Sequence, residues 1–301
     1  MDLLKLRQLA HIIRHGSFSE GAEALGISQS ALSKNIRSLE REVGAQLLER
    51  GRFGALPTPF GVALARHADA IDAELRAAHG DIADLKAARA GAITIGCGPS
   101  EATRLLPMAI ERLRRRAPGV KVTALYGLNG VLLPMVKHGE VDFSLSSIPS
   151  FSSDPEVKCI PLYEDAAAVI VRTGHPLLAL RRPLTPAQLV GCEWVLARRE
   201  ELERRALDEL FTAARLQPPE AAVETTSATL MQTMVMQSDF LTFLPRELIY
   251  WQERGKQLQA LNLTAPSWRR IVGITLRARA ASSPAIAAMI DELRRAANDL
   301  H

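Results

Sequence analysis

Residues 16–40 read GSFSEGAEALGISQSALSKNIRSLE, and this stretch holds the start and stop signals of two short helices. Ser17 begins a capping box, because its hydroxyl can accept from the amide of Glu20 while that glutamate reaches back. Gly26 ends the first helix, and Ser28 can cap the second. The predicted inward residues of the second helix are Ala31, Leu32, Ile36 and Leu39. The stretch therefore predicts two helices joined by a tight turn.

The outward face of the second helix is polar and partly basic, with no acidic residue. Its members are Gln29, Ser30, Ser33, Lys34 and Arg37. In helix-turn-helix proteins this helix enters the major groove of DNA. Gln29 lies at the amino-terminal end, where its amide can pair with adenine, whereas Lys34 and Arg37 are placed for phosphates. The same pattern also occurs on an ordinary solvated helix face, so the face alone leaves both interpretations open.

The rest of the first ninety residues is also predicted to be helical. An apolar stripe precedes the quoted stretch, and a long helix begins at Thr58-Pro59, where threonine can cap and proline fits the first turn. Apolar residues follow along the long helix at alternating steps of four and three: Leu64, Ala68, Ile71, Leu75, Ala78, Ile82 and Leu85. This heptad pattern favours a dimeric coiled coil, and packing on the chain's own core is the alternative.

From Gly91 onward, short strands alternate with amphipathic helices. Strands are predicted at 92–97, 120–126 and 141–146, with helices at 102–116 and 130–138 between them. Such an order predicts parallel strands with right-handed crossovers. Two further strands, 157–162 and 166–172, lead into a second alternation with strands at 194–197, 221–225 and 240–244 and helices at 200–215 and 228–237. A strand near 271–277 and a last helix at 284–300 complete two α/β lobes joined by crossing strands.

The quoted stretch resembles the amino-terminal signature of LysR-type transcriptional regulators. The resemblance continues through VGAQLLER at 43–50, TPFG at 58–61, ITIG at 93–96, LLP at 105–107, GEVDF at 139–143 and FLP at 243–245. It implies a multidomain chain: an all-α winged helix-turn-helix domain over 1–58, a dimerising linker helix over 59–90, and an α/β effector-binding domain over 91–301. The last domain would have two Rossmann-like lobes, as in periplasmic binding proteins, with lobe 1 at 91–162 and 267–301 and lobe 2 at 163–266.

The resemblance also implies partners. Arg50 and Arg52 would lie in the wing and contact DNA, which would be double-stranded with an interrupted palindromic operator. The chain would associate as a dimer and then as a tetramer, and RNA polymerase is a further candidate partner. A small-molecule effector would bind between the lobes.

Candidate effector-binding residues follow from the ends of the predicted strands, where ligands gather in open α/β sheets. They are Ser100, Thr103, Asn129, Ser147 and Thr226, with Arg198 as a candidate partner for a carboxylate. Ser100 and Thr103 are expected at the start of the helix over 102–116, whose free amides favour an anion. The pattern therefore favours a polar or anionic organic effector. Helix caps and turns are the alternative role for these hydroxyl residues.

Composition and charge restrict the class of protein. The 301 residues are 47% hydrophobic and 23% charged, which is typical of a globular chain. Residues 1–60 hold eight Lys and Arg against six Asp and Glu, so charge alone does not indicate nucleic acid. The amino terminus lacks the order of a signal peptide and no apolar run is long enough for a bilayer, so we expect a cytoplasmic protein without membrane contact.

Three alternatives to an effector-controlled regulator remain to be compared with the sequence: an enzyme, a redox-sensing regulator and a solute-binding protein. The seven histidines form no HExxH motif and no GxSxG or P-loop is present, so neither an enzyme nor a cofactor is expected, and His11 and His15 alone do not predict a metal site. Cys97, at the end of a predicted strand, leaves a redox-sensing regulator of the same fold open. A solute-binding protein is disfavoured by residues 1–60 and by the missing export signal.

Overall fold

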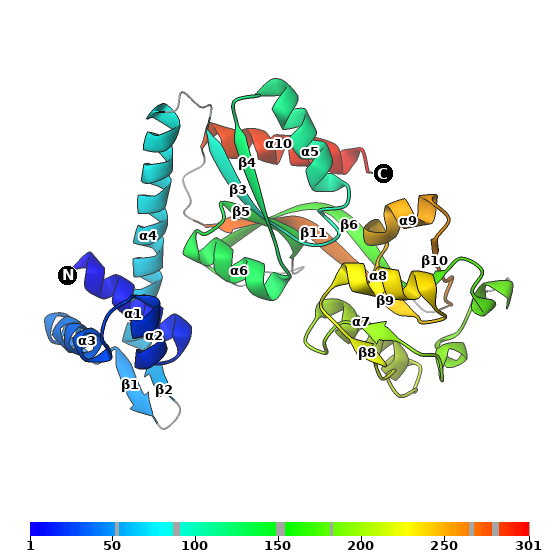
Figure 1. Cartoon of the computed structure of the whole chain (residues 1–301), viewed down its shortest axis with the longest axis horizontal. Coiled ribbons are helices and arrows are strands. Elements are labelled where there is room, and N and C mark those ends of the chain that lie inside the picture. The colour runs from blue at the N-terminus through cyan, green and yellow to red at the C-terminus, as the bar shows by residue number, and fades with distance from the viewer. Residues whose placement is uncertain are drawn as a thin grey trace.

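The computed structural model describes residues 1–51, 54–86, 91–148, 154–180, 183–264, 268–278 and 283–300. A small amino-terminal unit, a long helix and an α/β body follow one another (Figure 1). The elements of the first two parts are α1 (Leu3–His15), α2 (Phe18–Ala24), α3 (Gln29–Val43), β1 (Leu48–Gly51), β2 (Gly54–Pro57) and α4 (Pro59–Lys86). The predicted order of helix, helix, turn and helix, followed by a wing-like hairpin, is confirmed.

Capping hydrogen bonds fix where α2 and α3 begin. The hydroxyl of Ser17 accepts from the amide of Glu20 at 3.1 Å, and the hydroxyl of Ser28 accepts from the amide of Ala31 at 3.2 Å. Between the two helices Gly26 has a φ of 64°, a conformation that glycine adopts without steric cost. The local signals in the sequence therefore act as predicted.

The helices of the amino-terminal unit share one apolar core with the start of α4. Its most buried side chains, each no more than 1% exposed, are Leu9, Ile12, Leu32, Ile36, Leu39, Leu47 and Ala68. The prediction that Ala31 points inward is wrong, because this residue is exposed. Each step along a helix turns about 100°, so a buried stripe through Leu32 and Ile36 leaves position 31 outside it.

The helix α4 begins at the predicted cap. The first apolar residues of its heptad pattern are buried in the amino-terminal unit, and the later ones are more exposed. The hydroxyl of Thr58 accepts from the amide of Gly61 at 3.1 Å and donates to the carbonyl oxygen of Gln46 at 2.7 Å. Leu64 and Ala68 pack into the core of the amino-terminal unit, which corrects their prediction as part of a seam between subunits. Further along, Ile71, Ala78 and Ile82 are exposed and Leu75 is half-buried, whereas the side chain of Leu85 lies outside the described part.

The α/β body is built on one continuous sheet with the order β10-β6-β11-β5-β3-β4, and β9 pairs with β6. Its elements are β3 (Ala92–Cys97), α5 (Leu105–Arg116), β4 (Lys121–Tyr126), α6 (Asn129–His138), β5 (Phe143–Ile148), β6 (Val157–Arg172), β7 (Val195–Leu196), α7 (Leu202–Ala213), β8 (Val223–Glu224), α8 (Ala228–Gln237), β9 (Thr242–Pro245), α9 (Tyr250–Arg254), β10 (Leu258–Ala260), β11 (Trp268–Arg277) and α10 (Pro284–Asn298), with short 3₁₀ helices at Pro176–Leu180, Pro186–Leu189 and Arg246–Ile249.

Two lobes divide this body, and β6 and β11 run through both of them (Figure 1). Lobe 1 comprises β3, β4, β5, α5, α6 and α10, and lobe 2 comprises β7 to β10, α7, α8 and α9. The strand β3 pairs in parallel with β4 and β5, as predicted. The strands β6 and β11 are antiparallel to each other. Each lobe has its own apolar core, with Phe143 central in lobe 1 and Trp194 in lobe 2. No helix in the described ranges is long and apolar enough to cross a bilayer.

Two predicted boundaries differ from the structure. The predicted strands 157–162 and 166–172 form the single strand β6, because the pairing with β11 continues through a bulge. Between Val272 and Gly273 the register shifts by one residue, which leaves Leu162 without a partner next to Pro161. The helix predicted from residue 102 begins at Leu105, since residues 99–104 form turns. Ser100 and Thr103 consequently precede α5 instead of lying in its first turn.

Candidate functional site

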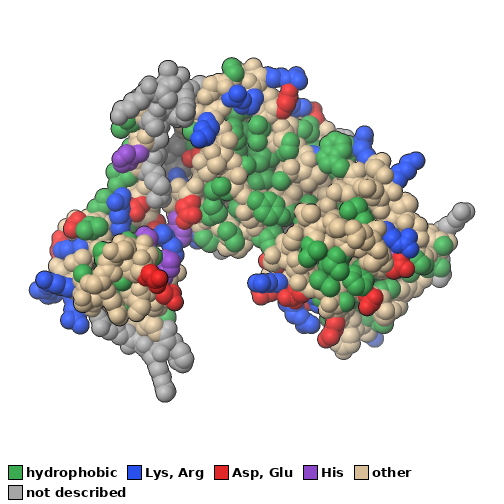
Figure 2. Space-filling view, viewed as in Figure 1, with side chains coloured by type: hydrophobic (Ala, Val, Ile, Leu, Met, Phe, Trp, Pro, Cys, Tyr) green, Lys and Arg blue, Asp and Glu red, His purple; other side chains and the backbone are tan. Residues whose placement is uncertain are grey.

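The outward face of α3 carries the predicted polar residues on the solvent side of the amino-terminal unit. Gln29, Ser30, Lys34 and Arg37 are exposed and Ser33 is half-buried. A surface groove runs along this face, lined by Ser30, Ser33, Lys34, Arg37, Glu40, Arg41, Gly44, Ala45 and Gln46. Figure 2 shows basic side chains projecting from the outer edge of the unit at α3. The face therefore combines hydrogen-bonding groups with an excess of positive charge.

Sequence reasoning missed Arg41 in this groove. It lies one helical turn after Arg37, and the i,i+4 spacing could have identified it. The acidic residue in the groove, Glu40, accepts from the backbone amides of Leu47 and Leu48 at 2.9 and 3.3 Å, so its charge is engaged in ordering the loop after α3. Two predicted wing contacts cannot be placed: Arg52 and the side chain of Arg50 lie outside the described residues.

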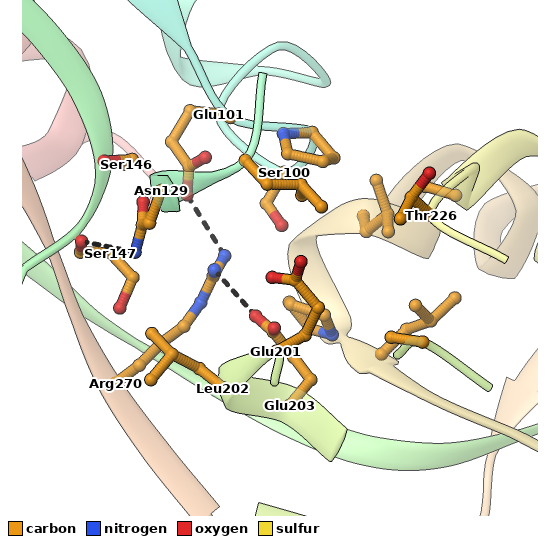
Figure 3. A pocket seen from close by; sticks show the side chains of 18 of the residues that line it. Ser100, Glu101, Asn129, Ser146, Ser147, Glu201, Leu202, Glu203, Thr226 and Arg270 are labelled. Atoms are coloured by element: carbon orange, nitrogen blue, oxygen red, sulfur yellow. Dashed lines mark hydrogen bonds and ion pairs between the residues drawn. The ribbon is translucent and has the colours of Figure 1, made fainter. Parts of the chain in front are cut away.

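A second candidate site is a cavity between the two lobes, which contains about 700 Å³ of space, part of it open to solvent. Ser100, Asn129 and Ser147 line it from lobe 1 and Thr226 lines it from lobe 2, so the structure brings four of the six predicted effector residues together (Figure 3). Asn129 begins α6 and donates from its side-chain amide to the carbonyl oxygen of Ser147 at 3.0 Å. Ser100 is almost fully buried.

The other two predicted effector residues do not line the cavity. Thr103 donates from its hydroxyl to the carbonyl oxygen of Pro99 at 3.3 Å, which makes it a turn residue, the alternative role weighed from the sequence. Arg198 is exposed in the turn before α7, where its carbonyl oxygen accepts from the amide of Glu201 at 3.0 Å. Strand ends identify which loops face a cleft, but not which side chain of a loop turns inward.

The sequence analysis missed the charged cluster in the wall of this cavity. Arg270, on β11, donates to Glu101 at 3.1 Å, to Asp165 at 3.0 Å and to Glu203 at 3.3 Å. The carboxylates come from three places: the loop after β3, the strand β6 and the helix α7. Arg270 thus joins lobe 1, a crossing strand and lobe 2. Figure 3 shows its contacts with Glu101 and Glu203. No local sequence pattern could indicate it, because Arg270 and Glu101 lie 169 residues apart in the chain.

Burial sets the protonation of this cluster. It raises the pKa of Glu101, which the positive charge of Arg270 only partly opposes. Burial alone would lower the pKa of Arg270, but the carboxylates around it raise that pKa, so the guanidinium stays charged. Gly98 fits closely beside the cluster, since a Cβ there would press against the carboxylate of Glu101, which is held by Arg270. The rest of the wall is apolar and includes Met231, Phe243, Leu244 and Leu248.

A second bridge between the lobes lies beside the cavity. Arg104 donates to the carboxylate of Glu247 at 3.0 Å, and its guanidinium lies 3.6 Å from the ring centre of Tyr250. Trp251 donates from its indole nitrogen to the carbonyl oxygen of Thr103 at 3.3 Å. A change in the angle between the lobes would have to alter these contacts together with those of Arg270.

The carboxyl-terminal end of α6 contacts the long helix α4. His138 lies with its Nε2 3.3 Å from the carboxylate of Asp69, which also accepts from Arg14 of α1 at 3.0 Å. Arg66 of α4 faces Glu156 at 3.6 Å, and Glu156 also pairs with Lys137 of α6 at 3.2 Å. Figure 2 shows acidic, basic and histidine side chains gathered where α4 faces the body. One helix therefore touches the cavity at its start and the linker helix at its end.

Cys97 has the environment of a packed core residue. It is 2% exposed, and its thiol donates to the carbonyl oxygen of Gly98 at 3.3 Å. Burial, with a smaller effect of Glu101, raises its pKa far above the ordinary thiol value. A reactive cysteine needs an exposed site that lowers the pKa. This observation speaks against the redox alternative. In the described ranges no three His, Cys, Asp or Glu residues are grouped as metal ligands.

Family models match both parts of the chain. The model described as "Bacterial regulatory helix-turn-helix protein, lysR family" matches residues 3–62, and the "LysR substrate binding domain" matches residues 86–298. Among similar proteins, the transcriptional regulator GbpR of Azospirillum brasilense is 32% identical, with 81% of this chain and 72% of the relative covered. The SDS degradation transcriptional activation protein of a Pseudomonas species is 30% identical, with 96% and 94% covered.

Solved structures share the fold over nearly the whole chain. A full-length OxyR variant from Pseudomonas aeruginosa has a TM-score of 0.62 at 24% identity, with 98% of this chain and 95% of that chain covered. CbnR in complex with its target DNA has a TM-score of 0.54 at 19% identity, with 99% and 100% covered. The two family matches, the helix-turn-helix unit and the two-lobed body lead to one conclusion. The chain belongs to the LysR family of bacterial DNA-binding transcriptional regulators.

Proposed function

We propose that a small molecule bound between the lobes controls how this regulator binds or bends its operator DNA. The observation that carries the proposal is the position of α6. Asn129 at its start lines the cavity, and His138 at its end contacts Asp69 of the linker helix. A ligand that shifts α6 would therefore act on the same carboxylate that holds Arg14 of the amino-terminal unit.

The face of α3 would make the DNA contacts. Gln29 and Ser33, near the amino-terminal end, would read base edges, while Lys34 and Arg37 would bind phosphates. Arg41 extends the phosphate-binding side of the same groove. Arg50, Arg52 and Ser30 are proposed as additional contacts from the wing and from the start of α3.

The exposed part of α4 would pair two subunits. Ile71, Ala78 and Ile82 face solvent at heptad spacing although two of them are large and apolar, and such a stripe is stabilised when a second helix covers it. A dimer would place two copies of α3 on the half-sites of an interrupted palindrome. Assembly to a tetramer and contact with RNA polymerase belong to the same proposal.

The proposal is tested with the full chain. Operator sequences are selected from random duplex DNA, and thermal-shift screening then finds ligands among cations, anions and neutral compounds. A ligand at 100 times its dissociation constant stabilises the folded state by about 2.7 kcal/mol. We expect at least one ligand that also changes operator affinity or DNA bending. Binding to selected sequences no tighter than to random DNA, or ligands that leave operator binding unaltered, would contradict the proposal.

A further inference from the structure

We propose that the effector of this chain is a small organic amine, bound as a cation on an apolar body. The inference rests on the proposed function and specifies the ligand of the same cavity. It replaces the expectation of an anionic effector that the strand-end hydroxyls favoured. Three features carry it: the carboxylates in the cavity wall, the engagement of Arg270, the one cationic side chain among the described residues that line the cavity, and the apolar surface of the same wall.

Among the charged side chains that line the cavity, negative ones outnumber positive ones. Glu101, Glu201 and Glu203 contribute three negative charges and Arg270 one positive charge, which leaves a net charge of −2. Burial raises the pKa of Glu101, which reduces this excess. The helices α6, α7 and α8 all begin at the cavity, and the positive end of each adds about half an elementary charge. The charges around the cavity therefore nearly balance, and the sign of the ligand depends on which charged side chain is left to pair with it.

The guanidinium of Arg270 is already paired with carboxylates, so it is not available to bind an anionic ligand. Its donors are directed to Glu101, Asp165 and Glu203, and its side chain is 7% exposed. An anion could bind Arg270 only by displacing a carboxylate, which would then lose its ion pair inside the cavity wall. Leaving a buried charge without its partner costs several kcal/mol, so this exchange is unfavourable.

Glu201 is the carboxylate left for a ligand. It lies just before α7 and lines the cavity, and it has no hydrogen bond or ion pair with any side chain that the structure describes. Its side chain reaches from lobe 2 toward the space between Ser100 and Arg270 (Figure 3). Burial and the neighbouring carboxylates of Glu203 and Glu200 raise its pKa, which the charges of Arg198 and Arg205 only partly oppose, so a positive charge on the ligand would further stabilise its ionised form.

The rest of the cavity wall is apolar, which favours a ligand whose uncharged part is apolar too. Met231, Phe243, Leu244 and Leu248 supply apolar surface from lobe 2. Burying apolar ligand surface against them is favourable by roughly 25 cal/mol per Å². Ser100 and Ser147 line the lobe 1 side, where their hydroxyls could bond a polar group of the ligand. An ammonium group on an aromatic or aliphatic body matches all three parts of the wall.

Two sets of ligands matched in shape test the inference. Phenethylamine, phenethyl alcohol and hydrocinnamate share a phenyl ring and a two-carbon chain, and hexylamine, hexanol and hexanoate share an alkyl chain. Calorimetric titration of the full chain at neutral pH should rank an amine first in at least one set, by about tenfold or more, because a hydrogen bond to a charged group contributes about 1.5–3 kcal/mol. Added salt should weaken amine binding more than alcohol binding.

Glu201→Gln keeps the shape of the side chain and removes its charge, so amine affinity should fall about tenfold. Glu200→Gln is the matched control, because Glu200 is exposed in the same turn and does not line the cavity. Tighter binding of a carboxylate or alcohol, no amine binding, or an unchanged affinity in Glu201→Gln would each overturn the amine class and leave the proposed function standing. An amine that binds but leaves operator affinity unaltered would instead overturn the proposed function.

Discussion

At the scale of single residues, we predict that position along α3 separates two kinds of DNA contact. Replacing Arg37 by alanine should weaken binding to cognate and random DNA alike and lower the salt slope of binding by about one unit, because one phosphate contact is lost. Gln29→Ala should instead weaken binding to the cognate operator alone, by roughly 1–3 kcal/mol of binding free energy. Binding isotherms at several salt concentrations on both duplexes measure the two effects. A Gln29→Ala protein with unchanged sequence preference would contradict the assignment.

Cys97 provides a prediction against the redox alternative. Its thiol is buried and its pKa is raised, and the thiolate is the form that reacts with peroxide. We expect native Cys97 to remain unmodified by hydrogen peroxide or iodoacetamide under conditions that label the partly exposed Cys192. Peptide mass spectrometry measures the labelling, and denatured protein is the control in which Cys97 should react. Rapid oxidation of Cys97 in the folded chain would restore the redox interpretation.

At the scale of elements, the start of α4 packs in the amino-terminal unit, whereas its later apolar residues are exposed and are the predicted contact between subunits. Ile71→Asp should dissociate the dimer and weaken operator binding, because the charge would lie in an apolar seam between two helices. Ala70→Asp introduces the same charge at a neighbouring exposed position outside the seam, and it should leave the dimer intact. Sedimentation velocity and operator titration test both variants. If Ile71→Asp remained dimeric with normal DNA affinity, α4 would not be the subunit contact.

Local signals in the sequence placed the elements, because they act over a few residues. The caps at Ser17, Ser28 and Thr58 bond to amides three residues away, so the sequence predicted where α2, α3 and α4 begin. The division of the α4 seam was not predictable in this way. Leu64 and Ala68 have the same spacing as the exposed residues after them, and only the packing of α1 against α4 distinguishes the two groups.

The candidate cavity was predictable only in part, for the same reason. The strand-end rule located the loops that carry Ser100, Asn129 and Ser147. It gave no information on Arg270, which meets Glu101 of the first of these loops only through the folding of distant segments. The charge of the cavity depends on that long-range pair, so the sequence could favour a polar or anionic ligand but could not weigh the carboxylates of the assembled wall against it.

At the scale of the whole molecule, the two lobes and the amino-terminal unit are connected through few contacts. Arg270 and Arg104 bridge the lobes, and His138 and Lys137 connect α6 to the surroundings of α4. Binding can change operator affinity only to the extent that the ligand prefers one arrangement of these parts, typically by 1–3 kcal/mol. Each of the contacts can be removed singly, so the transmission from cavity to DNA is open to direct measurement.

His138 is the most informative of these contacts, because Asp69 joins it to Arg14 across three helices. In His138→Ala, the operator affinity without ligand and the affinity for the ligand should each stay within about twofold of the unaltered protein. The ratio of operator affinities with and without ligand should fall toward one, because the coupling energy of typically 1–3 kcal/mol is lost. His79→Ala is the control: His79 is exposed on α4, and its ring contacts the carbonyl oxygen of Leu75 within the same helix. Operator titrations with and without saturating ligand give the ratio for each variant. A full ligand response in His138→Ala would mean that the signal reaches DNA by another route, such as a rearrangement between subunits.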